Sequence, residues 1–265
     1  MAIDYVVDYD CIPKQTLGTG GILERLKGQE RADAIIALFR RNGDQRPPTE
    51  MGFEMVRTAA DGSEETQVIV VQHLLDAAEE LNPLVHHCAG CPANHTGRPF
   101  GCMSRVSYPL SGMGEAWLLN RLPEPIEPLV WLLLRQGIEE FGYDGHTARG
   151  LREGGRTIFQ EERTIYRPLG EITVTSDQVF EMTFLLGNLQ PNHIGVLLLF
   201  YGAIERDLEA NTIMHVGTLP VSERERFAFI IEPHADDDQT TAELKAFLYG
   251  LYTAWRLDTA LMLDV

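Results

Sequence analysis

Three of the four cysteines lie within fifteen residues of one another, and their types and spacing could hold a metal ion. The cluster consists of Cys88, Cys91 and Cys102. A Cys-x-x-Cys turn can direct two thiolates at one ion from a single bend, and a third cysteine can return to the same centre after a Gly- and Pro-rich excursion. The sequence therefore predicts a metal site in this segment.

The fourth ligand of such a site has two candidates. Cys11 is the one remaining cysteine, and four thiolates complete a tetrahedral zinc site. It follows the first expected strand, where a fixed backbone could hold its thiol against the loop. His95, four residues after Cys91, is the alternative, because a neutral imidazole also binds zinc. The predicted ligands are thus Cys11, Cys88, Cys91 and Cys102, with His95 as the alternative fourth ligand.

Zinc is the predicted cofactor, and an iron–sulfur cluster is the alternative. Zinc sites more often use two close pairs of ligands, whereas three clustered cysteines and a distant one, with Pro92 after Cys91, also suit an iron–sulfur cluster. Zinc would make the site a structural clasp in an interaction or accessory module, and a cluster would make the protein a redox or sensor protein. Three cysteines in one loop disfavour the simpler interpretation that they are small buried apolar residues.

A second candidate site combines a histidine with three carboxylates, His234 with Asp236, Asp237 and Asp238. Such a set could serve a metal-dependent hydrolase or lyase. However, the segment lacks a second histidine and directly precedes an expected helix, whose positive N-terminal end favours carboxylates. Helix capping is therefore the favoured interpretation, and whether the protein is an enzyme stays open.

The composition indicates a packed globular protein, with 44% apolar and 23% charged residues. The net charge of −17 repels phosphate backbones and anionic lipid headgroups, which argues against nucleic acid as a partner. One segment is rich in arginine but is interrupted by glutamates, so we interpret it as a solvated, mixed-charge surface. Its arginines are Arg149, Arg152, Arg156, Arg163 and Arg167.

We expect no export signal and no membrane-spanning segment in the chain. Its first residues have no basic start and no long apolar run. The longest apolar stretch, 194–204, is shorter than the roughly 20 residues needed to cross a bilayer and predicts a buried helix. We therefore expect a cytoplasmic protein with no membrane partner, in which apolar helices could support a protein partner or self-association.

The elements expected in the first half are short and mixed. Alternation of apolar and acidic residues over 3–9 predicts a half-buried strand. A Gly-rich turn at 17–21 and apolar residues at helical spacing up to 39 predict one broken helix or two short ones. The remaining expected elements are a hairpin at Asp61-Gly62, a helix over 74–81 and a strand over 106–110.

Beyond residue 111 the pattern becomes mainly helical, with apolar runs of helical length and a small sheet between them. The sequence therefore predicts an α+β fold, with a small mixed or antiparallel sheet and helices in the N-terminal half and a mostly helical C-terminal half. The Pro-rich segment 123–128 is the expected seam between subdomains 1–122 and 123–265, unless these form one continuous domain.

Overall fold

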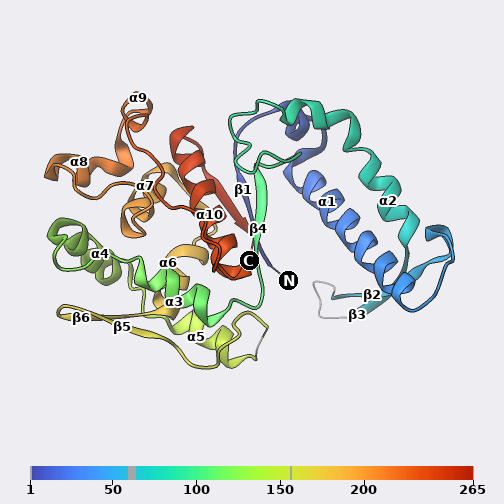
Figure 1. Ribbon diagram of the computed structural model, residues 1–265, viewed down its shortest axis with the longest axis horizontal. Coiled ribbons are helices and arrows are strands. Elements are labelled where there is room, and N and C mark those ends of the chain that lie inside the picture. The colour runs from blue at the N-terminus through green and yellow to red at the C-terminus, as the bar shows by residue number, and fades with distance from the viewer. Residues whose placement is uncertain (1, 59–63, 156, 265) are drawn as a thin grey trace. The chain divides into compact units, whose positions relative to one another are not determined.

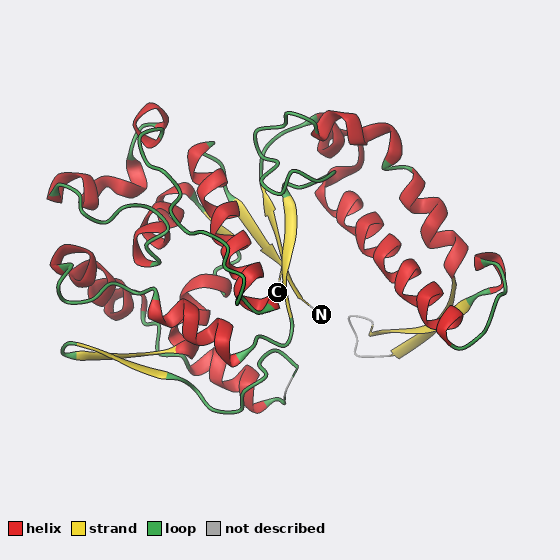
Figure 2. Cartoon of the chain, in the orientation of Figure 1, coloured by secondary structure: helices red, strands yellow, loops and turns green. Residues whose placement is uncertain are grey.

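The computed structural model describes residues 2–58, 64–155 and 157–264. It consists of helices and small antiparallel sheets (Figures 1 and 2), and the predicted α+β fold class is confirmed. Contacts divide the chain into two compact units: unit 1 comprises Met1–Tyr9 and Cys91–Val265, and unit 2 comprises Asp10–Gly90. The domain boundary expected at residue 122 falls inside unit 1. The division into subdomains 1–122 and 123–265 stays a prediction.

Unit 1 contains a four-stranded antiparallel sheet that joins the two ends of the chain. Strand β1 (Ala2–Val7) pairs with β4 (Met103–Ser107) on one side and with β8 (Leu261–Asp264) on the other. Strand β8 also pairs with β7 (Asn188–Leu189), which gives the order β4-β1-β8-β7. The first strand was predicted, whereas β4 lies three residues earlier than expected and β8 was not predicted.

Helix α10 (Gln239–Arg256) packs against this sheet and supplies much of the core. Phe247 of α10 meets the ring of Tyr5 from β1 edge to face at 5.2 Å, and both residues are fully buried. Gly250 makes this approach possible, because a Cβ atom there would lie 3.0 Å from Cε2 of Tyr5. The absence of a side chain at Gly250 therefore sets how closely α10 approaches β1.

The other elements of unit 1 are short helices and one hairpin around this centre. Helix α7 is buried over most of its length, as predicted for the apolar stretch. The elements are α3 (Gly112–Asn120), α4 (Pro128–Phe141), α5 (His146–Glu153), β5 (Tyr166–Leu169), β6 (Ile172–Thr175), α6 (Ser176–Phe184), α7 (Pro191–Phe200), α8 (Ala210–His215), η3 (Val216–Thr218) and α9 (Val221–Arg224).

Unit 2 is a pair of helices with a β-hairpin and a small core of its own. Helix α1 packs against α2, and Ala32, Met51 and Val71 form the fully buried centre. Gly18 interrupts α1 with φ of 70°, where the glycine-rich turn was expected. The hairpin is confirmed, although Asp61-Gly62 lies outside the described residues. The elements are α1 (Ile12–Arg41), η1 (Pro48–Glu50), β2 (Gly52–Thr58), β3 (Glu64–Val70), α2 (Val71–Glu79) and η2 (Asn82–Cys88).

In the described part of the chain, no helix is long and apolar enough to span a bilayer.

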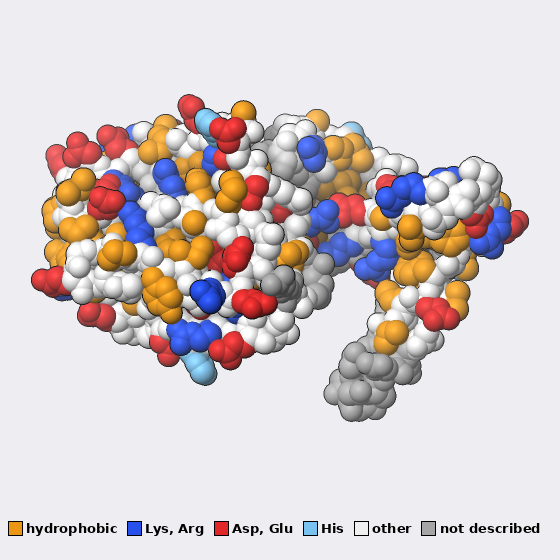
Figure 3. Space-filling view, turned by 60° about the horizontal axis from the view of Figure 1, so that its bottom comes forward, with side chains coloured by type: hydrophobic (Ala, Val, Ile, Leu, Met, Phe, Trp, Pro, Cys, Tyr) orange, Lys and Arg blue, Asp and Glu red, His pale blue; other side chains and the backbone are white. Residues whose placement is uncertain are grey.

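On the face of unit 1 seen in Figure 3, Lys and Arg side chains lie among Asp and Glu side chains. The visible surface of this unit is therefore of mixed charge.

We expect Gly250→Val to lower the free energy of unfolding by about 1 to 3 kcal/mol, because the new side chain collides with Tyr5. Gly150→Val is the matched control, since Gly150 is also helical but has open space beside it. Urea unfolding of both variants tests this expectation. Equal stability of the two variants would contradict it.

Candidate functional site

The structure places the four cysteines on four different parts of the chain. Cys11 is the residue before helix α1, and Cys88 ends η2, both in unit 2. Cys91 begins the loop of unit 1 that follows, and Cys102 directly precedes β4, where its carbonyl accepts a hydrogen bond from the backbone N–H of Val7. None of the four forms a disulfide.

The predicted metal function is wrong. Among the described residues, which include all four cysteines and His95, no three His, Cys, Asp or Glu side chains are grouped so that they could hold a metal ion. A Cys-x-x-Cys spacing allows two thiolates to converge but does not enforce it, and here each cysteine is positioned by a different element. The clasp, the iron–sulfur sensor and the metal-dependent hydrolase are all overturned. Zinc or a cluster as a cofactor stays a prediction from sequence alone.

His95, the alternative ligand, packs among aromatic rings. Its ring stacks on Tyr5 at a centroid distance of 5.7 Å and meets Tyr249 edge to face at 6.5 Å. Its backbone N–H donates to the carbonyl of Gly101, which closes the loop. Burial lowers the pKa of His95 from 6.5 to about 4, because the surroundings disfavour the charged imidazolium. At neutral pH the ring is therefore an uncharged part of the core beside β1.

The histidine and carboxylates at 234–238 serve the start of α10. Asp238 caps the helix by accepting from the backbone N–H of Thr241 at 2.8 Å. Asp237 accepts from Nζ of Lys245, and the side chain of His234 is 71% exposed. The capping interpretation is confirmed for Asp238, and in the described part of the chain these side chains form no group that could hold a metal ion.

The arginine-rich segment contains a buried charge network that the sequence analysis missed. Arg152, interpreted above as solvated, has a side chain only 2% exposed. Its Nη2 donates to Oε2 of Glu115 at 2.5 Å and to Oδ1 of Asp177 at 2.7 Å, and its Nη1 donates to the carbonyl of Glu161 at 2.8 Å. Its guanidinium also lies 3.9 Å from the ring centroid of Phe159. Arg156 lies outside the described residues.

This network joins three helices and carries an imbalance of charge. Glu115 comes from α3, Arg152 from α5 and Asp177 from α6, so one guanidinium faces two carboxylates. Burial raises the pKa of Glu115 above 4.5, while its bonds to Arg152 lower it. Burying ions costs several kcal/mol each unless they are paired, so each member depends on the others.

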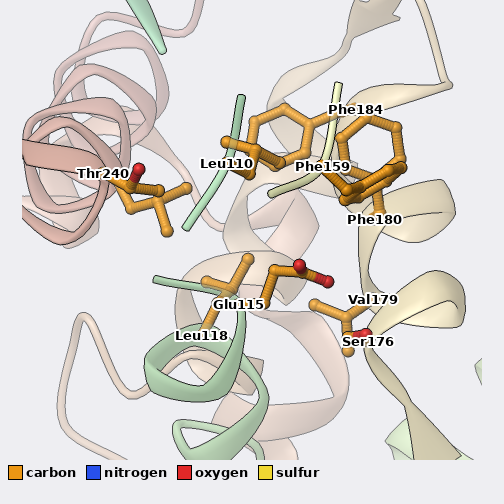
Figure 4. A pocket seen from close by; sticks show the side chains of 10 residues that line it. Leu110, Glu115, Leu118, Phe159, Ser176, Val179, Phe180, Phe184 and Thr240 are labelled. Atoms are coloured by element: carbon orange, nitrogen blue, oxygen red, sulfur yellow. The ribbon is translucent and has the colours of Figure 1, made fainter. Parts of the chain in front are cut away.

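A small cavity lies beside the Glu115 carboxylate. Figure 4 shows the rings of Phe159, Phe180 and Phe184 on one side and Glu115 with Ser176 on the other. Its volume is about 20 Å³, enough for one water molecule. The cavity is therefore too small for a substrate, and we assign it to the packing around the network.

A polar hollow of about 560 Å³ lies on the surface nearby. Its hydroxyl groups are already engaged: Ser111 caps α3 and donates to Asp238, and Thr164 donates to Asp177. No histidine is among the described residues that line it, and the base beside Ser111 is the Asp238 carboxylate, which also caps α10.

A third hollow is an apolar pocket of about 410 Å³ within unit 1. Met182, Leu197 and Phe200 supply buried lining, while Phe141 and Met214 line it with side chains that are 65% and 64% exposed. Small-molecule sites are typically apolar hollows of roughly 300 to 1,000 Å³ with a few polar groups. The polar residues that line this pocket are Gln136, Glu140, Asn192, His193 and Thr218. We name it the α4–α7 pocket.

One wall is fixed by the turn that follows α4. Gly142 ends the helix in the left-handed conformation with φ of 66°, which favours glycine. Gln178 donates to the carbonyl of Tyr143 at 2.8 Å, and buried Glu181 accepts from the backbone N–H groups of Gly145 and Thr147 at 2.9 and 2.7 Å. Helix α6 therefore holds the turn that carries Tyr143, a lining residue, in place.

The opposite wall depends on a close approach between α7 and η3. A Cβ atom at Gly195 would lie 2.9 Å from the carbonyl oxygen of Val216, and one at Gly217 would lie 2.5 Å from that of Asn192. Both glycines are therefore required where these elements meet.

The chain matches no protein-family model, no curated protein and no solved structure.

Sequence reasoning missed both the network and the pocket. Arg152 stands beside Glu153 in a polar segment, which is typical of a solvated surface, and nothing local identifies Glu115 as its partner. The apolar lining of the pocket comes from helices whose apolar residues predict a core equally well. The one usable signal was local: Phe141, Tyr143 and His193 are large rings at helix ends.

We expect Arg152→Met to lower the free energy of unfolding at pH 7 by about 3 to 5 kcal/mol, because it leaves two carboxylates buried without their cation. The loss should shrink as the pH falls, since burial raises the pKa of Glu115 and protonation removes its charge. Chemical unfolding at pH 4.5 and pH 7 measures both effects.

Arg149→Met is the control for Arg152→Met. Arg149 lies on the same helix, 4.0 Å from Asp177, but its side chain is 46% exposed. Its removal should cost at most about 1 kcal/mol, as for other exposed ion pairs. A similar loss in both variants would contradict the importance of the buried network.

We expect His95 to destabilise the fold in acid. The folded state keeps His95 neutral down to about pH 4, whereas the unfolded chain takes up a proton near pH 6.5, so stability falls as the pH drops through this window. The loss approaches about 3 kcal/mol at pH 4, because each pH unit is worth about 1.4 kcal/mol. His95→Phe should abolish this contribution, and His146→Phe, an exposed control, should not. Unfolding curves recorded from pH 7 to pH 4 measure this contribution. If the stability of His95→Phe depended on pH as the wild type does, the expected role of His95 would be refuted.

Proposed function

We propose that this protein binds a small, mainly apolar molecule in the α4–α7 pocket. The observation that carries the proposal is a hollow of about 410 Å³ whose lining is apolar except for five polar residues. Burying apolar surface is worth roughly 25 cal/mol per Å², so an apolar ligand that covers this lining gains free energy in proportion to the area covered.

Two further features support a ligand site. The exposed side chains of Phe141 and Met214 place large apolar groups in water at the pocket, which is typical of binding surfaces. The wall behind Tyr143 is held by three hydrogen bonds to α6, so a ligand would meet a preformed site. Neither the Glu115 cavity nor the polar hollow offers this combination.

Self-association is the competing use of this surface, since the same exposed side chains could pack against a second copy of the chain. A cytoplasmic location and the exclusion of nucleic acid stay predictions. Ligand binding is favoured over self-association because the polar residues surround a hollow of small-molecule size rather than a flat apolar face.

A neutral apolar dye tests the proposal. We expect N-phenyl-1-naphthylamine to bind with a stoichiometry of one and to gain fluorescence, and Gly137→Phe to weaken its binding at least tenfold. Gly137 lines the pocket in the middle of α4 and has open space beside it, so phenylalanine enters the hollow without a clash. Gly-to-Phe changes in a helix do not lower helix propensity, so the variant should stay folded.

Gly150→Phe is the matched control, because Gly150 is also helical with open space beside it but does not line the pocket. It should bind the dye as the wild type does. No dye binding by the wild type, or equal binding by both variants, would overturn the proposal. Light scattering during the titration detects self-association. If the dye bound at an interface between copies of the chain, its signal would depend on protein concentration.

A further inference from the structure

We infer that the ligand of the α4–α7 pocket carries a cationic head group, an ammonium or substituted ammonium ion, which lies beside Glu140 and the rings of Phe141, Tyr143 and His193. This inference rests on the proposed function and adds the chemical class of the ligand. It follows from the charges and rings that the pocket presents where its lining is exposed.

Among the described residues, Glu140 is the one carboxylate that lines the pocket, and no cationic side chain of these residues pairs with it. Its Oε1 accepts a hydrogen bond from Nε2 of Gln136 at 2.7 Å, and no ion pair to it occurs among the described residues. No Lys or Arg is among the described residues that line the pocket. A ligand cation would therefore find a carboxylate that no side chain of the described chain already neutralises.

The position of Glu140 in its helix strengthens the case. It lies in the last turn of α4, where the helix dipole places partial negative charge and where cations are favoured. That turn contains no basic residue, and the adjacent Glu139 is also acidic. Arg135 pairs with Glu139 at 4.0 Å, so the negative charge left at this helix end is that of Glu140 and of the helix dipole, and a bound cation would offset it.

Three rings provide a second, independent attraction. Phe141 is near both of the other rings, with centroid distances of 6.0 Å to Tyr143 and 6.4 Å to His193, and it is nearly perpendicular to His193 at 89°. Cations bind ring faces within about 6 Å of the centroid. Burial and the negative charge of Glu181 also raise the pKa of Tyr143, which keeps its hydroxyl protonated at neutral pH.

One feature acts in the opposite direction. Asn192 and His193 lie in the first turn of α7, whose N-terminal end carries about half a positive charge and would favour an anion. The full charge of Glu140 exceeds it, and the C-terminal end of α4 offsets part of it. The net charge of −17 further disfavours anionic ligands such as fatty acids. The balance therefore favours a cation.

The test compares three ligands with the same ten-carbon tail and different head groups, each used to displace the dye below its micelle concentration. They are decyltrimethylammonium, uncharged decyldimethylamine N-oxide and decanoate. We expect the cation to bind at least tenfold more tightly than the N-oxide at pH 7.5, and decanoate to bind most weakly. Gly137→Phe should weaken the binding of all three ligands, which would show that they bind in the pocket.

Glu140→Gln should bring the ratio between the affinities for the cation and for the N-oxide close to one. Glu139→Gln is the matched control, because Glu139 lies in the same turn, pairs with Arg135 at 4.0 Å and does not line the pocket. Phe141→Leu should weaken the binding of the cation several-fold more than the binding of the N-oxide.

The outcomes separate the two proposals. Dye binding with no preference for the cation, with a preference for decanoate, or with a cation preference that survives Glu140→Gln would overturn the head-group inference and leave the pocket intact. Failure of the wild type to bind the dye and all three ligands would overturn the pocket itself.

Discussion

The pairing of Arg152 with Glu115 and Asp177 is the interaction on which the arrangement of unit 1 depends most. It joins α3, α5 and α6 at a point where none of the three side chains is more than 5% exposed. Because an isolated ion in such surroundings would cost several kcal/mol, the three helices are restricted to arrangements that keep the ions together. Phe159 stacks on the guanidinium, so the apolar core continues directly from the charged centre.

The same helix connects this centre to the proposed binding site. Asp177 lies in the first turn of α6, and Glu181, one turn later, binds the backbone of the segment that follows α4. Gln178, which lies between these two residues in α6, donates to the carbonyl of Tyr143. The wall of the α4–α7 pocket is thus fixed by polar groups of the helix that closes the charge network, which explains how a surface pocket acquires a rigid geometry. Apolar packing alone would leave this turn less precisely placed.

The cysteine loop shows how far a spacing pattern can mislead. Cys88 and Cys91 fit a metal-binding turn in sequence, yet no three His, Cys, Asp or Glu side chains of the described residues are grouped so that they could hold a metal ion. His95, the alternative fourth ligand expected from the sequence, packs on Tyr5, and burial lowers its pKa. Ligand convergence requires several side chains to point at one centre, and spacing along the chain specifies only that they are able to.

The sequence by itself determined the α+β class, the first strand, the hairpin of unit 2, the buried α7 and the role of Asp238 as a helix cap. Each of these follows from interactions among residues a few positions apart, which periodicity and capping patterns report directly. Only the tertiary structure decided that Arg152 is buried, that the described residues form no group able to hold a metal ion and that the α4–α7 pocket exists. Arg152 meets partners 37 and 25 residues away, and the pocket lining runs from Leu133 to Thr218. Contacts between such distant residues depend on how the helices pack, and the local pattern around each residue does not encode its partner.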